Sequence, residues 1–248
     1  MRLLVLSDVH ANATALAAAL SACRGQWDQS VCLGDLVGYG PDPNEVVEQV
    51  RGLVAAIIRG NHDKAACGLG DLEDFNPVAR SVVEWTRQQL RPENLRYLAE
   101  LPAGPLQVDG VTLVHGAFHD EDEYVFVPEQ AIDGFLVAPG AVTLFGHTHM
   151  QGGFLCRDSE PEIIPLRVPG AESHFTVLAL ESGLRYLLNP GSIGQPRDGD
   201  ARAAFAILDS DQKVVQFWRV PYDVGVVQER MRRAQLPEPL ALRLATGH

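Results

Sequence analysis

The sequence predicts an α/β fold in which two β-sheets pack face to face with helices on the outside. In the first half, short apolar segments alternate with helical patterns, which is typical of βαβ units with buried parallel strands. The second half contains many short strand patterns separated by turn signals, which favours a second sheet. At 248 residues the chain can bury a full core, and without long linkers or repeats we expect a single domain over 1–248.

The first half should alternate strands and helices and then become helical. The expected strands are Leu3–Leu6, Val31–Leu33 and Ala55–Ile58, and the expected helices are Thr14–Cys23 and Pro43–Arg51. Two further helices should follow, because Asn76 and Pro77 form an N-terminal signal and Pro92–Leu101 ends before a proline. We expect this helical insert, about 72–101, to rim the functional site together with the loop 119–124.

The remaining segments are predicted to be strands, followed by one amphipathic helix at 223–234. A hairpin is expected at Asp109-Gly110, between Leu106–Val108 and Val111–Val114, and a further strand at Val142–Phe145. Later strand patterns are assigned to a second, mostly antiparallel sheet; they lie near 153–156, 174–180, 184–188, 203–208 and 213–219.

Composition excludes several classes of protein. The 32 acidic residues against 20 basic ones give a net charge of −12, which argues against binding long nucleic acid. The longest apolar run, Leu53 to Ile58, is far below the roughly 20 residues of a membrane span. Because the N-terminus also lacks the pattern of a signal peptide, we expect a cytoplasmic protein that binds no membrane. The four cysteines are widely spaced and are expected to be buried thiols.

Polar residues follow five of the apolar strand patterns in the chain. Each strand ends in Asp, Asn or His, usually beside glycine, in the segments Ser7-Asp8-Val9-His10, Gly34-Asp35, Gly60-Asn61-His62-Asp63, His115-Gly116 and Gly146-His147-Thr148-His149. Ligands of such sheets bind at the carboxyl ends of strands, where neighbouring loops meet. We therefore expect these side chains to form one cluster.

The residue types in this cluster predict a metal centre. Asp8 and His10, like His147 and His149, are two positions apart, so in extended backbone both members of a pair point the same way. Imidazole, carboxylate and amide oxygen together suit Mn, Fe, Co, Ni or Zn rather than Ca or Mg alone. Seven ligands are too many for one ion and suit two ions that share a carboxylate.

In this order, the segments resemble the calcineurin-like metallophosphoesterases, whose five-part pattern is fully matched by Asp8-x-His10, Gly34-Asp35-x-x-Gly38, Gly60-Asn61-His62-Asp63, His115-Gly116 and Gly146-His147-x-His149. The resemblance extends to about residue 200 and includes Asn189-Pro190-Gly191-Ser192. The segment from Gly38 to Asn44 is similar to small bacterial phosphodiesterases and diadenosine tetraphosphatases. The fold implied is a four-layer α/β/β/α sandwich with two mixed sheets.

The resemblance also implies roles for individual residues. One metal would be bound by Asp8, His10, Asp35 and His149, and the other by Asp35, Asn61, His115 and His147, with Asp35 bridging. Two divalent transition-metal ions are implied, Mn first, with Fe, Zn, Ni or Co as alternatives. A metal-bridging hydroxide would attack phosphorus, and His62 would be the general acid, oriented by Asp63 or Asp35.

Substrate contacts are suggested less directly by the sequence. Asn12 can contact a phosphoryl oxygen or cap the helix that follows it, and Tyr39 can stack on a base or pack internally. Arg59 can bind a phosphate or form an ordinary surface ion pair. The substrate expected is a small phosphodiester or a dinucleoside polyphosphate. The alternatives are a phosphomonoesterase or Ser/Thr phosphoprotein phosphatase and, in a different class, a non-catalytic scaffold with this fold.

Overall fold

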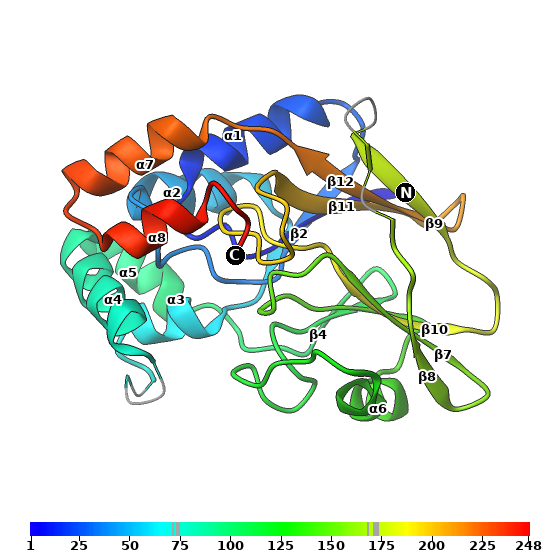
Figure 1. Ribbon diagram of the computed structural model, residues 1–248. Helices are drawn as coiled ribbons and strands as arrows, with labels where there is room; N and C mark the ends of the chain where they lie inside the picture. The colour runs from blue at the N-terminus through cyan, green and yellow to red at the C-terminus, as the bar shows by residue number, and fades with distance from the viewer. Residues whose placement is uncertain (71, 73–74, 168, 171–173) are drawn as a thin grey trace.

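The computed structural model describes residues 1–70, 72, 75–167, 169–170 and 174–248, and within them two six-stranded mixed sheets form the centre of the fold (Figure 1). Sheet A has the order β3-β2-β1-β11-β12-β9 and consists of β1 (Arg2–Leu6), β2 (Gln29–Cys32), β3 (Ala56–Ile57), β9 (Phe175–Ala179), β11 (Ala203–Asp209) and β12 (Val214–Val220). Sheet B has the order β4-β5-β6-β10-β7-β8 and consists of β4 (Leu106–Val108), β5 (Val111–Leu113), β6 (Val142–Leu144), β7 (Gly152–Arg157), β8 (Glu160–Ile163) and β10 (Arg185–Asn189).

Helices cover the outer faces of both sheets and one end of the molecule (Figure 1). Helices α1 (Ala13–Ala22) and α2 (Pro43–Leu53) pack on sheet A, and α6 (Pro128–Val137) packs on sheet B. The other helices gather at the end of the sandwich; they are α3 (Asn61–Ala66), α4 (Pro77–Gln89), α5 (Pro92–Ala99), α7 (Val224–Arg233) and α8 (Glu238–Arg243). The predicted four-layer α/β/β/α sandwich is therefore confirmed.

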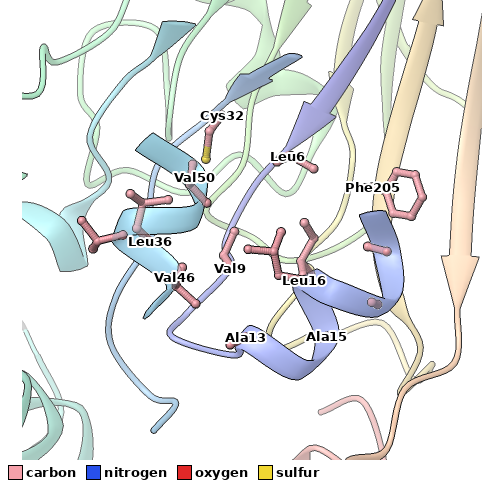
Figure 2. Close-up of a cluster of buried hydrophobic side chains, with 14 of the residues drawn as sticks. Leu6, Val9, Ala13, Ala15, Leu16, Cys32, Leu36, Val46, Val50 and Phe205 are labelled. Carbon is pink, nitrogen blue, oxygen red and sulfur yellow. The ribbon is translucent and has the colours of Figure 1, made fainter. Parts of the chain in front are cut away.

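The alternation of side chains along β1 explains why its sheet has two covered faces. Leu3 and Val5 belong to the core between the sheets, whereas Leu4 and Leu6 belong to the core beneath α1 and α2. Figure 2 shows the second of these cores, where Leu6 lies beside Leu16 of α1. Burying each such leucine contributes about 1.5–3 kcal/mol, so both faces help to hold β1 and the loop that follows it.

Local signals in the sequence set several element boundaries as expected. The Asn76 side chain accepts a hydrogen bond from Ala79 N at 2.9 Å and caps α4, which begins at Pro77. Asp109 and Gly110 both have positive φ, 47° and 86°, and connect the antiparallel strands β4 and β5. This is the backbone that a tight hairpin turn requires.

The assignment of all late strand patterns to a second sheet is wrong. The patterns at 174–180, 203–208 and 213–219 correspond to β9, β11 and β12, which continue sheet A, where β11 pairs with β1. Parallel pairs occur in sheet B as well, between β5 and β6 and between β6 and β10. The pairing of Leu3 with Leu208 joins opposite ends of the chain, and a local pattern carries no information on such a partner.

Four elements lie outside the sequence prediction, namely β8, α3, α6 and α8. Helices α3 and α8 have only six residues each, too few for a helical repeat to show. No helix in the described part of the chain is long and apolar enough to cross a bilayer.

Candidate metal centre

Five strand ends bring the predicted ligands to one edge of the sandwich. Strands β1, β2 and β3 run parallel in sheet A, and β5 and β6 run parallel in sheet B. Hydrogen bonds join the loops that follow them: Asp8 N donates to Gly34 O at 3.0 Å, and Gly146 N donates to His115 O at 2.8 Å. The loops therefore form one connected surface at the carboxyl ends of the strands.

A first group of buried ligands consists of Asp8, His10, Asp35 and His149, with one candidate ligand atom from each within 4.8 Å of all the others. Nε2 of His149 lies 3.0 Å from Nε2 of His10 and 3.3 Å from Oδ1 of Asp8. Nε2 of His10 is also 3.6 Å from Oδ2 of Asp35. These four side chains are close enough together to bind one metal ion.

A second group shares Asp35 with the first and contains His115 and His147. Nε2 of His115 lies 3.5 Å from Oδ2 of Asp35 and 3.3 Å from Oδ1 of Asn61, so Asn61 adds an amide oxygen to this group. The structure thus brings all seven predicted ligands together in the two expected sets. Metal binding by them stays a prediction.

Oδ2 of Asp35, which belongs to both ligand groups, is placed where a bound metal ion would satisfy it. Oδ1 of Asp35 accepts a hydrogen bond from His62 N at 2.9 Å, whereas Oδ2 is buried and has no hydrogen-bond partner within the described residues. Leaving a carboxylate oxygen buried without a partner costs several kcal/mol unless a cation binds it. Oδ2 lies between His10 and His115, as a bridging ligand would.

Backbone carbonyls orient the imidazole rings of the centre. Nδ1 of His115, His10 and His149 donates to Leu33 O at 2.7 Å, Val37 O at 2.9 Å and Gln195 O at 2.6 Å, respectively. Each ring therefore presents the lone pair of Nε2 to the cluster, which is how metal-ligating histidines are held. In His147, Nε2 donates to Asp122 O at 3.1 Å, which leaves Nδ1 as the ligand atom.

The titration behaviour of the cluster also favours cations. Burial opposes the charge of Asp35, but the neighbouring His115 and His62 outweigh it and hold the pKa of Asp35 well below its usual range. Burial lowers the pKa of His147 to about 3 and the pKa of His10 well below its usual value. Although burial acts the same way on His115, Asp35 raises the pKa of His115 to about 10. An ionised Asp35 beside neutral His10 and His147 is a donor set for divalent transition metals, whereas His115 has to release a proton when a metal binds it.

The backbone of the ligand loops differs from the expected extended conformation. Asp8, His10, Asp35, His147 and His149 all have φ between 47° and 65°. Asp8 and His10 therefore meet in the first group from left-handed and not extended backbone, while His147 and His149 reach different groups. Such residues cost about 1–3 kcal/mol each and cluster at functional sites.

The loop from Asn189 to Arg197 holds the ligand loops in place. Nδ2 of Asn189 donates to Gly146 O at 2.8 Å, beside His147. Oγ of Ser192 donates to Asp8 O at 2.7 Å, and Gly194 N donates to the same oxygen at 3.0 Å. The Asn-Pro-Gly-Ser segment therefore fixes two ligand loops, the one that carries His147 and the one that carries Asp8.

His62 lies next to the ligands, at the start of α3. It is buried, and Nδ1 of its ring has no hydrogen-bond partner within the part of the chain described. Burial lowers the pKa of His62 to about 4, against the opposing effect of Asp35. The ring lies 4.4 Å from that of Tyr39 and 5.0 Å from that of His10, between centroids.

The side-chain oxygens of Asp63, one of the two residues expected to orient His62, accept hydrogen bonds from backbone N–H groups. Its Oδ1 accepts from Leu36 N at 2.9 Å and Val37 N at 3.2 Å, and its Oδ2 accepts from Gly60 N at 3.1 Å. Burial and the negative Asp35 raise the pKa of Asp63 to about 7. Asp63 positions the loop that carries Asp35, while Asp35 itself holds the backbone of His62.

A cavity of about 160 Å³ opens beside the second ligand group, where Asn61 and His147 line it. Its lining includes Asn61, His62, Tyr39, Phe75, Tyr124 and His147. The start of the helical insert contributes Phe75, Asn76 and Ala79 to the lining, and the loop 119–124 contributes Asp122 and Tyr124. The cavity is the space in which a substrate can reach His62 and the second ligand group.

The three expected substrate contacts lie in different surroundings. Oδ1 of Asn12 accepts from Ala15 N at 3.0 Å and its Nδ2 donates to Gly194 O at 3.0 Å, so both polar groups are used within the fold. Nη2 of Arg59 forms an ion pair with Oε1 of Glu121 at 2.8 Å. Of the three, only Tyr39 lines the cavity with His62. Binding of substrate by Asn12, Tyr39 or Arg59 stays a prediction.

Gly38 supplies a test of how closely His62 is packed. A Cβ at Gly38 would lie 2.5 Å from Nδ1 of His62, and the φ of Gly38 is +87°. We expect Gly38→Ala to displace the His62 ring and lower kcat at least tenfold, with both metals retained. Gly25→Ala is the matched control, since Gly25 has φ +76° and no atom within 4 Å of a new Cβ. Equal activity of the two variants, measured at the same metal content, would contradict the packing argument.

Comparison with known proteins decides the family. The model of the calcineurin-like phosphoesterase superfamily domain matches residues 1–213. The chain belongs to this superfamily. A metallophosphoesterase from Sphaerobacter thermophilus has 42% sequence identity and a TM-score of 0.84, over 100% of this chain and 99% of that one. An uncharacterized protein of Methanocaldococcus jannaschii, MJ0912, is 34% identical over 98% of this chain and 97% of its own.

The fold of this calcineurin-like phosphoesterase is also shared by a more distant protein. The hypothetical protein PH1004 from Pyrococcus horikoshii has 21% sequence identity and a TM-score of 0.78, over 100% of this chain and 98% of that one. At this identity the comparison concerns the fold alone.

Two side chains of this calcineurin-like phosphoesterase are absent from the sequence prediction. Tyr124 stacks on His147, with 3.8 Å between ring centroids, and lines the cavity. Arg197 lies over the ring of Tyr39, with its guanidinium carbon 5.6 Å from the centroid. The position of Arg197 just after the Asn189–Ser192 segment is the one sequence signal that points to it.

Proposed function

We propose that the chain is a binuclear metal-dependent phosphoesterase that hydrolyses a small phosphodiester or a dinucleoside polyphosphate. The observation that carries this proposal is the pair of buried ligand groups that share Oδ2 of Asp35 beside a cavity lined by His62. Family membership supports phosphoester hydrolysis in general. The binuclear mechanism and the substrate belong to the proposal.

The residues divide the chemistry between them. When bound, two divalent ions supply positive charge for a phosphate ester and lower the pKa of water enough to give a nucleophile at neutral pH. His62 supplies the proton that the leaving oxygen needs, a contribution of typically 10²–10⁴-fold. Burial, helped by the nearby positive charge of Arg197, keeps the His62 imidazole neutral by lowering its pKa, and a negative phosphate next to it favours the protonated form.

The size of the cavity and the charge of the chain support a small substrate. The cavity is small, about 160 Å³, and has aromatic rings on its wall, Tyr39, Phe75 and Tyr124. A net charge of −12 disfavours a long polyanion, whereas two divalent ions make the pocket locally cationic for a single phosphate ester. We propose manganese as the first metal to test, followed by Fe, Zn, Ni and Co.

A panel of phosphoesters tests the proposed function. The protein is reconstituted with each metal and assayed on a bis-aryl phosphodiester, a dinucleoside polyphosphate, an aryl phosphomonoester and a phosphoserine peptide. We expect metal-dependent turnover of the first two and none of the peptide. Preferred turnover of the monoester or the peptide would replace the diesterase assignment by the phosphatase alternative. If a metal-replete preparation hydrolyses none of these phosphoesters, the enzymatic function is refuted and the non-catalytic scaffold is favoured.

A further inference from the structure

The positively charged side chain of Arg197 lies at the edge of the candidate metal centre. Its guanidinium lies over Tyr39, and Nη2 donates to Oε1 of Gln195 at 3.2 Å. The side chain of Tyr124, which lines the cavity, also interacts with this guanidinium. Arg197 therefore lies between two aromatic residues that border the cavity.

The guanidinium of Arg197, a half-buried residue, lacks the acidic partner that arginines packed against the fold normally have. Ion pairs with carboxylates are formed by Arg59, Arg202 and Arg219, but none is formed by Arg197 among the residues described. Nε of Arg197 is buried and, within the same residues, has no hydrogen-bond acceptor. A cation without a carboxylate partner is costly where water is partly excluded, and an anionic ligand that contacts the guanidinium compensates for this cost.

The position of Arg197 is rigidly tied to a metal-ligand loop. Arg197 N donates to His149 O at 3.2 Å, and Gln195 O accepts from Nδ1 of His149 at 2.6 Å. The positive charge of Arg197 contributes to lowering the pKa of both His149 and His62, after burial as the main cause. Because the Tyr39 ring beneath the guanidinium lies 4.7 Å from the His10 ring and 4.4 Å from the His62 ring, Arg197 is near both the first ligand group and His62.

We propose that Arg197 is a substrate-binding residue whose guanidinium donates to a phosphate oxygen at the metal centre, with Tyr124 beside it. Arginine suits this role because its planar fork matches two phosphate oxygens and is always charged. The inference rests on the proposed function and adds a residue that determines which phosphate esters bind. The phosphate is either the one that reacts or a second phosphate next to it.

Arg197→Gln and Arg197→Lys test the assignment, with Arg202→Gln as the matched control from the same loop region. We expect Arg197→Gln to weaken inorganic phosphate binding, measured by calorimetry on the metal-loaded protein, by about 10- to 100-fold. Arg197→Lys should recover part of this loss, because it keeps the charge and loses the fork. Arg202 is paired with Asp200, so its variant should bind phosphate like the wild type.

Kinetics on two substrates show whether Arg197 binds the reacting phosphate or a second phosphate next to it. An equal loss of kcat/KM on a bis-aryl phosphodiester and a dinucleoside polyphosphate would place Arg197 on the reacting phosphate. A loss confined to the dinucleoside polyphosphate would place it on the neighbouring one. Unchanged phosphate binding in Arg197→Gln, at equal metal content, would overturn the assignment. If the wild type hydrolyses no phosphoester, the proposed function fails, but calorimetry can still show whether Arg197 binds phosphate. The two proposals can therefore fail separately.

Discussion

Asp35→Asn is expected to lower the content of both metals in the reconstituted protein to below about half an equivalent each. Oδ2 of Asp35 is 3.6 Å from Nε2 of His10 and 3.5 Å from Nε2 of His115, so it belongs to both ligand groups. Asparagine keeps the size of the side chain and can still accept the hydrogen bond from His62 N through its amide oxygen. It removes the negative charge that two adjacent cations require. Elemental analysis after gel filtration measures the result.

Two controls make the metal result specific to Asp35. Asp28→Asn alters an exposed aspartate that pairs with Arg2, and this variant should retain both metals. Asp8→Asn changes a ligand of the first group alone, so we expect it to reduce one metal more than the other. If Asp35→Asn keeps a full equivalent of either metal, Asp35 is no bridging ligand and the two-group assignment is contradicted.

His62→Gln is expected to keep both metals and to lose about 10²–10⁴-fold in kcat on a substrate with a poor leaving group. His62 belongs to neither ligand group, but it borders the second group and the cavity. On an activated aryl ester the loss should be much smaller, because a stable aryl oxide leaves without a proton. The measurement is the ratio of kcat values on an alkyl and an aryl ester of the same phosphate.

The control for His62 is His174→Gln, an exposed histidine beside Trp218. This variant should behave like the wild type on both esters. Equal losses on the alkyl and aryl esters in His62→Gln, with metal content intact, would show that His62 only shapes the site. A loss of metal in the same variant would place His62 among the ligands instead.

The metal centre could be located from sequence because its residues follow strand ends. Strand patterns of three to six apolar residues are visible locally, and polar residues after them meet at one sheet edge whichever order the strands take. The positions of Asp8, Asp35 and His115 follow from this rule alone. The division into two groups depended on the family resemblance, and the side-chain geometry is consistent with it.

The rest of the structure depends on contacts that a local pattern does not contain. β11 joins β1 across the length of the chain, so the sheet to which a late strand belongs cannot be inferred from its own residues. The left-handed backbone of His147 and His149 is another feature that the strand pattern before them does not predict. Arg197 is a candidate substrate-binding residue because it forms no ion pair among the residues described, and a sequence pattern does not show ion pairs.

Anomalous diffraction from crystals soaked in manganese tests the central claim most directly. We predict two manganese peaks, about 3.5–4 Å apart, on either side of Oδ2 of Asp35. The first should lie among Asp8, His10 and His149, and the second among Asn61, His115 and His147. A single peak, or peaks bound by other residues, would contradict the binuclear centre on which the proposed function depends.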